Sequence, residues 1–547
     1  MQRRDFLKAG LVASGATLAS ACGTPPAEDR KAAEAGTAGE TPLPEFEHAG
    51  ATVAELQAGQ AEGRLTARVL AEAYLLRMDA IDVAGPRLNA VIERNPAALD
   101  IAEALDRERS EKGARGPLHG IPVLIKDNID TADRMRTSAG SLALAESIAQ
   151  RDAFVVARLR AAGAVILGKT NLSEWANFRS TRSTSGWSGR GGLTRNPYAL
   201  DRSPCGSSSG SGAAAAADLC AVAVGTETDG SIVCPSKSCG LVGIKPTVGL
   251  VSRAGIIPIS ASQDTAGPMT RTVADAAALL SVLAGADPRD PATARSAGRL
   301  QADYTTFLRA DALKGARIGV ARGLYGENAL VARVVDEALE ALRKQGAELV
   351  DPVDLKTRPE LDEAEWLVLQ YEFKAGIRDY LATLHPDTPH QTLEHLIAFN
   401  EANRDREMPW FGQEIFIGCQ EKGPLDSKEY REAVALCRRL STTEGIDAIM
   451  DRHELDALVA PTGDPAFTID LVNGDHYTGG GTSTYPAVSG YPHITVPAGQ
   501  VFGLPVGLSF FGRAWSEGRL IALAYAFEQA TRHRQGPRFL RTAELPA

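Results

Sequence analysis

Apolar residues recur every three or four positions along the early part of the chain, between residues 50 and 110. This spacing puts them on one face of a helix and predicts helices that begin near Thr52 and Thr66. A threonine hydroxyl at that position can accept hydrogen bonds from the free amides of the first turn. We therefore expect both threonines to be N-caps.

Further along, the apolar residues form short unbroken runs instead. The run 121–125 follows a glycine and ends at Lys126, and a second run covers 164–168 after a helical pattern at 153–162. Runs of this length between turn residues are typical of buried strands. Because these strands alternate with helices, the pattern predicts an α/β fold, with a sheet covered by helices on both faces.

The second half of the chain contains a mainly helical stretch at about 290–440, with charged faces and several aromatic residues. We interpret it as an insertion over the face of the sheet that carries the site. Apolar runs at 457–461, 494–497 and 504–511 then predict three more core strands.

The N-terminal residues have a different pattern, in which Arg3 and Arg4 precede Phe-Leu-Lys and an apolar run ends at residue 21. This is typical of a twin-arginine export signal over residues 1–21, and the run is shorter than the ~20 apolar residues that cross a bilayer. We expect a periplasmic or extracellular protein. Its mature N-terminus is either a free cut end or a lipidated Cys22 that anchors it to the membrane. Proline and glycine in 22–44 predict a flexible tether, which leaves 45–547 as the folded domain.

Composition narrows the function classes. A chain of 547 residues with 44% hydrophobic and 23% charged residues is typical of a large soluble enzyme. Its formal net charge of −10 disfavours a general role in binding nucleic acid, which depends on neutralising phosphates with lysine and arginine.

Six cysteines follow Cys22, at positions 205, 220, 234, 239, 419 and 437. They are too few for a disulfide framework. Because twin-arginine substrates generally fold in a reducing cytosol, we expect buried free thiols rather than disulfides. A zinc site at Cys234 and Cys239 is disfavoured, since no nearby pair of cysteines or histidines completes four ligands.

Two clusters of serine and glycine stand out, at 206–212 and 225–231. Clusters of this kind are usually plain loops, and a lone lysine at a strand end, such as Lys126, is usually solvated. The residues themselves are more specific than the spacing, because Gly-Ser-Ser-Ser-Gly-Ser-Gly followed by Gly-Thr-Glu-Thr-Asp-Gly-Ser-Ile resembles the amidase signature family. The pattern continues at 240–247, 264–269 and 120–128 and covers nearly the whole mature chain.

Within that family, the stretches 171–179 and 225–235 are similar to those of bacterial peptide amidases. Many other members have Asp where Glu227 stands and Gly where Asp229 stands. The resemblance implies the amidase signature fold, a large mixed and twisted central β-sheet covered by helices on both faces, with the helical insertion added. It also implies a serine amidase that needs no metal or cofactor.

The resemblance assigns roles to individual residues. It implies Ser231 as the nucleophile, Lys126 as the base, and Ser207, preceded by a cis peptide bond, as the serine that bridges them. Independently of the resemblance, the glycine-rich turn before Ser231 predicts an oxyanion hole, because its backbone amides can converge on the developing negative charge. A supporting role falls to Ser208, in the hydrogen-bond network of the loop. Trp175 could line an acyl pocket, although core packing is the more common role of such an aromatic residue. The amides of the expected oxyanion hole belong to Thr228, Asp229, Gly230 and Ser231.

These residue types suit that chemistry. A serine hydroxyl is a poor nucleophile until a base takes its proton, and lysine can be that base only when it is unprotonated. Lys126 follows an apolar strand, and burial lowers the pKa of a lysine by penalising its charged form. We therefore expect hydrolysis of a carboxamide to a carboxylate and ammonia through an acyl-enzyme, with a small-molecule or peptide amide, and most specifically the C-terminal amide of a peptide, as substrate.

Other hypotheses fit the sequence less well. The elbow of an α/β-hydrolase would place Ser208 as nucleophile and His453, His476 or His493 as base, but it needs an apolar strand immediately before the serine, and 196–205 is polar. A dinucleotide loop at 210–215 lacks that strand too.

Two more alternatives remain within the family scaffold. One is the A-type subunit of an amidotransferase that releases ammonia from glutamine. The export signal and the negative net charge oppose it. The other is a non-catalytic binding protein, which would normally have lost the nucleophile or the base, and here all three residues are present. The sequence does not indicate the oligomeric state.

Overall fold

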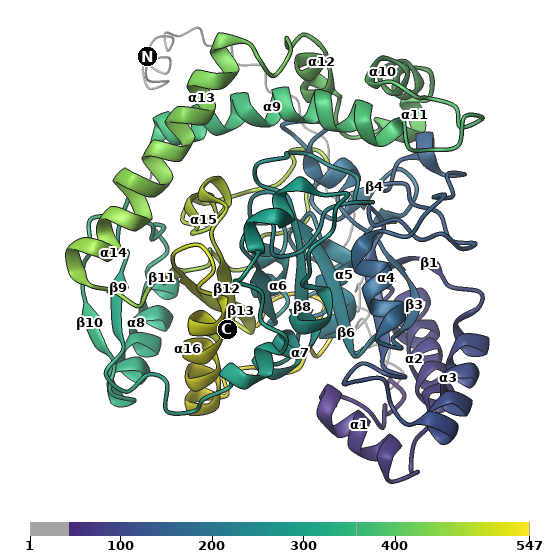
Figure 1. The fold of residues 1–547 in the computed structure, drawn as a ribbon, viewed down its shortest axis with the longest axis horizontal. Helices are drawn as coiled ribbons and strands as arrows, with labels where there is room; N and C mark the ends of the chain where they lie inside the picture. Colours follow the sequence, from purple (N-terminus) through teal and green to yellow (C-terminus); the bar gives the residue numbers. More distant parts are fainter. Residues whose placement is uncertain (1–42, 357, 546–547) are drawn as a thin grey trace, which may run out of the picture. The chain divides into compact units, whose positions relative to one another are not determined.

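The computed structural model describes residues 43–356 and 358–545. The predicted export signal, Cys22 and nearly all of the predicted tether therefore lie outside the described residues. The centre of the fold is an eleven-stranded sheet (Figure 1). Its strands follow one another across the sheet in the order β1 (Val91–Arg94), β3 (Val165–Thr170), β2 (Pro122–Lys126), β6 (Val222–Glu227), β8 (Thr265–Thr270), β7 (Val242–Lys245), β12 (His493–Val501), β13 (Leu504–Phe511), β11 (Ala457–Pro461), β9 (Arg317–Val320) and β10 (Glu348–Val350).

The sheet is mixed, as predicted. β2 runs parallel to both of its neighbours, β3 and β6, whereas β8, β7, β12 and β13 pair with their neighbours antiparallel. Every residue of β2, β3 and β6 is buried, which explains why these strands read as continuous apolar runs. Since β2 and β6 are parallel, their carboxyl ends meet at one edge of the sheet.

The strands expected from apolar runs are confirmed at β2, β3, β11, β12 and β13. The first two helices are confirmed as well, as α1 (Val53–Ala61) and α2 (Ala67–Met78). Thr52 accepts a hydrogen bond from the Glu55 amide, and the Glu55 side chain bonds back to the Thr52 amide. Thr66 caps α2 through the Val69 amide.

Two groups of helices pack against the sheet. α5 (Ser209–Ala216) and α6 (Val233–Ser238) contact each other and the central strands β6, β7, β12 and β13 between them. The helices of the other group also pack on strands of the sheet. Each helix in this group contacts the next one in the order given below. The group consists of α4 (Phe154–Ala161), α7 (Val273–Leu283), α16 (Glu517–Thr531) and α8 (Ala329–Lys344). α3 (Ala98–Lys112) packs on α2 and on β3.

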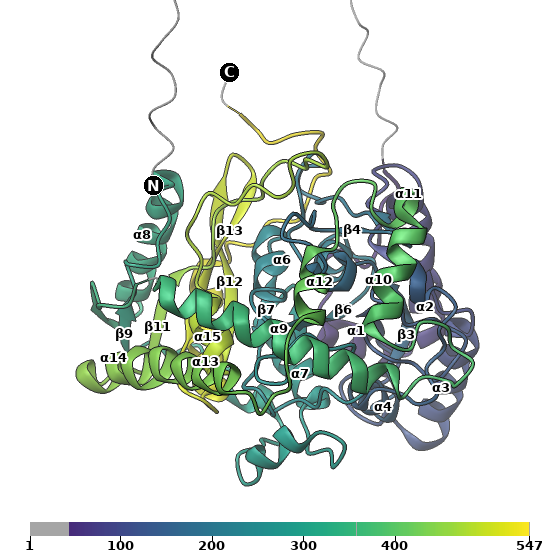
Figure 2. The same ribbon diagram turned by 90° about the horizontal axis from the view of Figure 1, so that it is seen from above.

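The mainly helical stretch differs in extent from the predicted 290–440. That region also supplies β9 and β10 to the sheet, and the helices run on from residue 359 to 453. α9 (Pro359–Leu381) lies beside α13 (Lys428–Arg438) in both views (Figures 1 and 2). Four shorter helices complete the segment, namely α10 (Leu393–Ala402), α11 (Arg404–Glu407), α12 (Glu414–Gln420) and α14 (Asp447–His453).

α9 lies over the edge of the sheet where β2 and β6 end. Its Glu365 accepts a hydrogen bond from Gln263, and its Tyr380 donates one to Asp130, four residues beyond the end of β2. Among the described residues, no helix has both the length and the apolar character needed to cross a membrane.

Candidate active site

Three segments meet at the edge of the sheet below α9. Lys126 is the last residue of β2, Thr226 is the penultimate residue of β6, and Ser207 lies two residues before α5. The side chains of Lys126 and Ser207 are fully buried. The parallel pairing of β2 with β6 explains how residues 100 positions apart come into contact.

The Lys126 ammonium nitrogen has three close contacts. Its Nζ lies 2.7 Å from Ser207 Oγ, 2.9 Å from Thr226 Oγ1 and 3.3 Å from the Thr226 carbonyl oxygen. Burial lowers the pKa of Lys126 to about 7, against the opposing effect of the negative charges of Asp264 and Glu227. A large fraction of Lys126 is therefore neutral at neutral pH.

This arrangement fits a neutral amine. The amine has two hydrogens and one lone pair, and the two Thr226 oxygens can accept the hydrogens. The lone pair is then left to accept the Ser207 hydroxyl proton. Asn128 Nδ2 donates to Thr226 Oγ1 at 3.0 Å and holds that side chain in place.

The segment before α5 holds Ser207 in position. The Gly206–Ser207 peptide bond is cis, as the resemblance implied. The next residue, Ser208, donates from its hydroxyl to the Thr226 carbonyl at 3.0 Å and accepts from the Thr226 amide at 3.2 Å. Ser208 thus ties this segment to β6.

The turn between β6 and α6 carries Ser231. The Glu227 carboxylate accepts hydrogen bonds from the Ile232 and Val233 amides at 2.7 and 3.0 Å, which fixes the chain just after Ser231. Gly230 has a φ of +78°, a conformation that favours glycine. These hydrogen bonds and the Gly230 conformation together fix the backbone conformation of the turn.

The four residues of the expected oxyanion hole line one pocket. The pocket has a volume of about 650 Å³ and is lined by Thr228, Asp229, Gly230 and Ser231. Ser231 is 8% exposed. Within the described part of the chain, no backbone hydrogen bond of a turn or loop starts from the amides of these four residues, so they are free to bind an oxygen atom in the pocket.

The rest of the pocket wall comes from distant segments. Ala176 and Phe178 lie on one side, and the loop 463–481 supplies much of the remainder. Trp175 lies beside this wall, in a buried cluster where its ring contacts Phe416 edge to face at 5.5 Å. Its neighbours in the chain, not Trp175 itself, are thus the residues that line the pocket.

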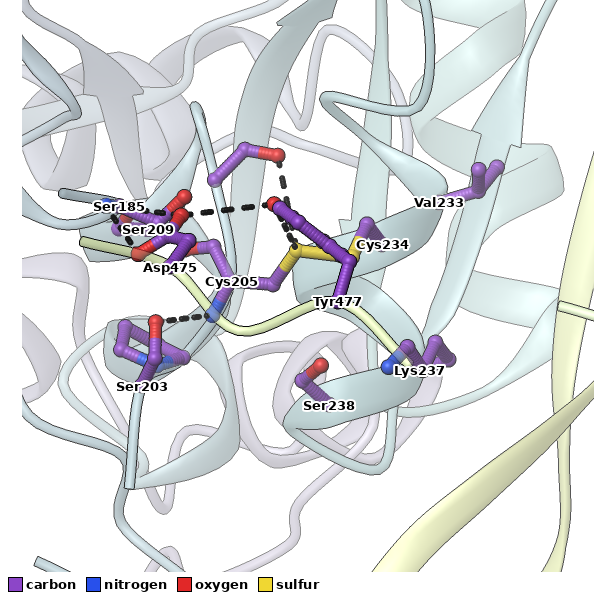
Figure 3. Close-up of a disulfide and its surroundings, with 12 residues drawn as sticks. Ser185, Ser203, Cys205, Ser209, Val233, Cys234, Lys237, Ser238, Asp475 and Tyr477 are labelled. Carbon is purple, nitrogen blue, oxygen red and sulfur yellow. Dashed lines mark hydrogen bonds between the residues drawn. A yellow bond between two sulfur atoms is a disulfide. The ribbon is translucent and has the colours of Figure 1, made fainter. Parts of the chain in front are cut away.

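The predicted state of the cysteines was wrong for one pair, because Cys205 and Cys234 form a disulfide (Figure 3). Packing of the segment before Ser207 against α6 brings their Cα atoms within 5.9 Å, inside the range for a disulfide. The bond joins the two serine-bearing segments, and the Tyr477 hydroxyl lies 3.8 Å from Cys205 Sγ. Cys220, Cys239, Cys419 and Cys437 are free and buried.

No histidine offered as an alternative base contacts Ser208. His493 is buried on β12, where its Nε2 bonds to Ser509 Oγ at 2.5 Å and burial lowers its pKa to about 3. No strand precedes Ser207 between residues 194 and 206. The α/β-hydrolase alternative is therefore excluded.

Comparison with known proteins bears directly on this site. The family model described as Amidase matches residues 70–521. The chain belongs to this family. The structure of native peptide amidase from Stenotrophomonas maltophilia is 53% identical to this amidase, with a TM-score of 0.87 over 90% of this chain and 100% of that one.

Sequence relatives of this amidase fall into more than one class. A probable amidase from Arabidopsis thaliana is 42% identical over 500 residues, which cover 90% of this chain and 92% of the relative. The A-type subunit of glutamyl-tRNA(Gln) amidotransferase from Caldanaerobacter subterraneus subsp. tengcongensis is 34% identical over 490 residues, covering 88% of this chain and 96% of the relative.

Sequence reasoning missed the roles of three residues in this amidase. Thr226 contacts the Lys126 amine directly, and Asn128 acts on it through a hydrogen bond to Thr226. Glu227 shapes the turn that carries Ser231. All three residues stood inside the recognised motifs. Only the pairing of β2 with β6 places Thr226 beside Lys126, and the motifs do not contain that pairing.

Proposed function

We propose that this amidase hydrolyses the C-terminal amide of peptides, with Ser231 as nucleophile, Ser207 as bridging serine and Lys126 as base. The observation that carries the proposal is the buried Lys126 amine, 2.7 Å from Ser207 Oγ and with a pKa lowered to about 7. The substrate class is supported by the 53% identity to a peptide amidase along nearly the whole domain.

In the first half of the reaction, Ser231 Oγ attacks the amide carbon. Its proton passes to Ser207 Oγ, whose own proton passes to Lys126 Nζ. The carbon–nitrogen bond then breaks, Ser207 gives its proton to the leaving nitrogen, and Lys126 returns a proton to Ser207. Ammonia leaves, and the acyl group remains on Ser231.

In the second half, water takes the place of ammonia. Its proton passes through Ser207 to Lys126 as its oxygen attacks the acyl carbon, and the collapse of the intermediate returns a proton to Ser231. In both halves the carbonyl oxygen becomes negatively charged, and in this proposal the amides of the 228–231 turn, which lines the pocket, bind it. One such donor is typically worth about 3 kcal/mol to the transition state.

The test is release of ammonia from amidated dipeptides by the purified protein. Ser231→Ala, Ser207→Ala and Lys126→Met should each lower kcat/KM by at least about a thousandfold. Lys428→Met is the matched control, because its side chain is 84% exposed, and it should keep the full rate. Full activity in the Ser231 or Lys126 variant would overturn the mechanism.

The same assay separates the alternatives. An A-type amidotransferase subunit would release ammonia from free glutamine in preference to amidated peptides, and a non-catalytic scaffold would release none from any amide. Lys126, Ser207 and Ser231 are all present in the sequence, which favours catalysis over a binding role alone.

We further propose that the protein is exported by the twin-arginine route. The Cys205–Cys234 disulfide is consistent with a protein that folds before export and whose paired thiols oxidise after it reaches an oxidising compartment. Mass spectrometry of the N-terminus of the protein from its native host tests this. A diacylglycerol group on Cys22 or a cut end near residue 21 is expected, and an intact Met1 would contradict export.

A further inference from the structure

The pocket that holds Ser231 also contains a buried lysine that the mechanism does not use. Lys237 lies in the last turn of α6, lines the pocket and is 5% exposed. Its Nζ donates to the backbone carbonyl of Asp464, and no ion pair of Lys237 occurs within the described part of the chain. Lysine is rarely buried without a paired anion.

Lys237 remains mostly charged at neutral pH. Burial lowers its pKa to about 8, and the negative charge of Asp464 opposes that shift. The Asp464 carboxylate accepts a hydrogen bond from the Thr478 hydroxyl. The Lys237 ammonium has three hydrogens and one acceptor among the described residues, so donor capacity is left for a ligand in the pocket that Lys237 lines.

A second cation lies at the same end of the pocket. Arg202 also lines it, and its guanidinium donates to the Ala466 carbonyl at 3.4 Å. Residues 464 and 466 are two positions apart, so the carbonyls that receive Lys237 and Arg202 lie within about 7 Å of each other. Arg202 has a partly exposed partner in Asp201, at 3.5 Å.

Two carboxylates complete the charged groups of the wall. Asp464 lies beside Lys237, and Asp229 lies in the turn next to Ser231. The Asp229 carboxylate accepts a hydrogen bond from Thr484, and burial raises its pKa. At the end formed by Lys237 and Arg202, two cations line the pocket against the one carboxylate of Asp464, so an anionic group of a substrate is favoured there rather than beside Asp229.

We propose that Lys237, assisted by Arg202, binds a carboxylate carried by the acyl part of the substrate, so that the preferred substrates are amides of acidic peptides. This inference rests on the proposed function and adds a substrate class to it. Lys237 is a specificity-determining residue, and the reacting serines do not depend on it for proton transfer.

The test measures kcat/KM on two series of acetylated dipeptide amides, acetyl-X-Leu-NH2 and acetyl-Leu-X-NH2, where X is Glu, Met or Lys. Glu and Met have similar lengths, so their ratio reports charge. In the wild-type protein the Glu substrate should exceed the Met substrate at least about tenfold in one of the two series, as a charge-assisted hydrogen bond provides.

Variants separate recognition from a structural role. Lys237→Met should bring the Glu-to-Met ratio to about one, mainly through KM for the Glu substrate, and Lys237→Arg should restore most of the ratio. Lys428→Met removes the same charge from an exposed site and should keep the wild-type ratio. A change in stability alone would lower the rates for both substrates and leave their ratio intact.

Two results would overturn the inference. One is a wild-type protein that hydrolyses both series without preferring Glu in either, and the other is a Glu preference that survives in Lys237→Met. If the wild-type protein hydrolyses no dipeptide amide at all, the proposed function fails first, and this outcome is distinct from both.

Discussion

Thr226→Val is the most informative single substitution around the base. Valine keeps the shape of threonine and removes only the Oγ1 atom. That atom accepts hydrogen bonds from Lys126 Nζ at 2.9 Å and from Asn128 Nδ2 at 3.0 Å. The variant therefore leaves the base and both serines in place and removes only what orients the Lys126 amine.

The structure sets the size of the effect. A buried donor left without its acceptor costs about 1 to 3 kcal/mol. If one such loss acts on the transition state through the misdirected lone pair of Lys126, kcat/KM falls about tenfold to a hundredfold, since about 1.4 kcal/mol corresponds to a factor of ten. The charged form of Lys126 loses an acceptor as well, so its pKa falls. The rising limb of the pH profile then moves below pH 7.

Thr137→Val is the matched control. Thr137 Oγ1 accepts from Lys169 Nζ at 3.0 Å, and Lys169 is another buried lysine whose pKa is lowered by burial. Both variants should lower the free energy of unfolding, measured by urea denaturation. Only Thr226→Val should change kcat/KM and the pH profile of ammonia release.

Activity of Thr226→Val within twofold of the wild type, with an unmoved pH profile, would refute the orientation argument. An equal loss of activity in Thr137→Val would refute it too, because the effect would then follow from stability rather than from the position of the amine.

Three further predictions concern other parts of the molecule. In the wild type, kcat/KM should rise with pH through about 7 and then level off, because the neutral form of Lys126 is the active one; a profile that falls across this range would contradict a lysine base. Cys205→Ser should lower the free energy of unfolding by roughly 3 to 4 kcal/mol in urea denaturation, given its 29-residue separation from Cys234. In the same assay, reductant should destabilise the wild type by the same amount and leave the variant unchanged. Arg179→Met should lower the unfolding free energy by about 3 kcal/mol or more, because its ion pair with Glu174 at 2.8 Å is fully buried; a loss under 1 kcal/mol in the same assay would contradict this.

Much of the core could be predicted from the sequence. The strand that ends at Lys126 is short, apolar up to that lysine and bounded by turn residues, which is the pattern of a buried strand. The capping role of Thr52 and Thr66 could be predicted as well, because capping depends only on residues within three positions. The serine clusters were found through resemblance, which the family match confirmed.

The remaining features depend on contacts between distant segments. β9 and β10 have only four and three residues, and β10 is partly exposed at the edge of the sheet, so neither produces a clear apolar run. The Cys205–Cys234 pairing follows from the packing of α6 against the segment before Ser207, which no local pattern contains. The Thr226 contact with Lys126 requires the order of strands in the sheet.

The central claim is that Ser231 carries the acyl group, and mass spectrometry of the trapped acyl-enzyme tests it most directly. A peptide amide is mixed with the protein and quenched in acid within milliseconds, and the digested protein is searched for the added acyl mass. The account predicts the acyl group on the fragment that contains Ser231, and none in Ser231→Ala. An acyl group on Ser207 or Ser208, or turnover in Ser231→Ala without any adduct, would contradict it.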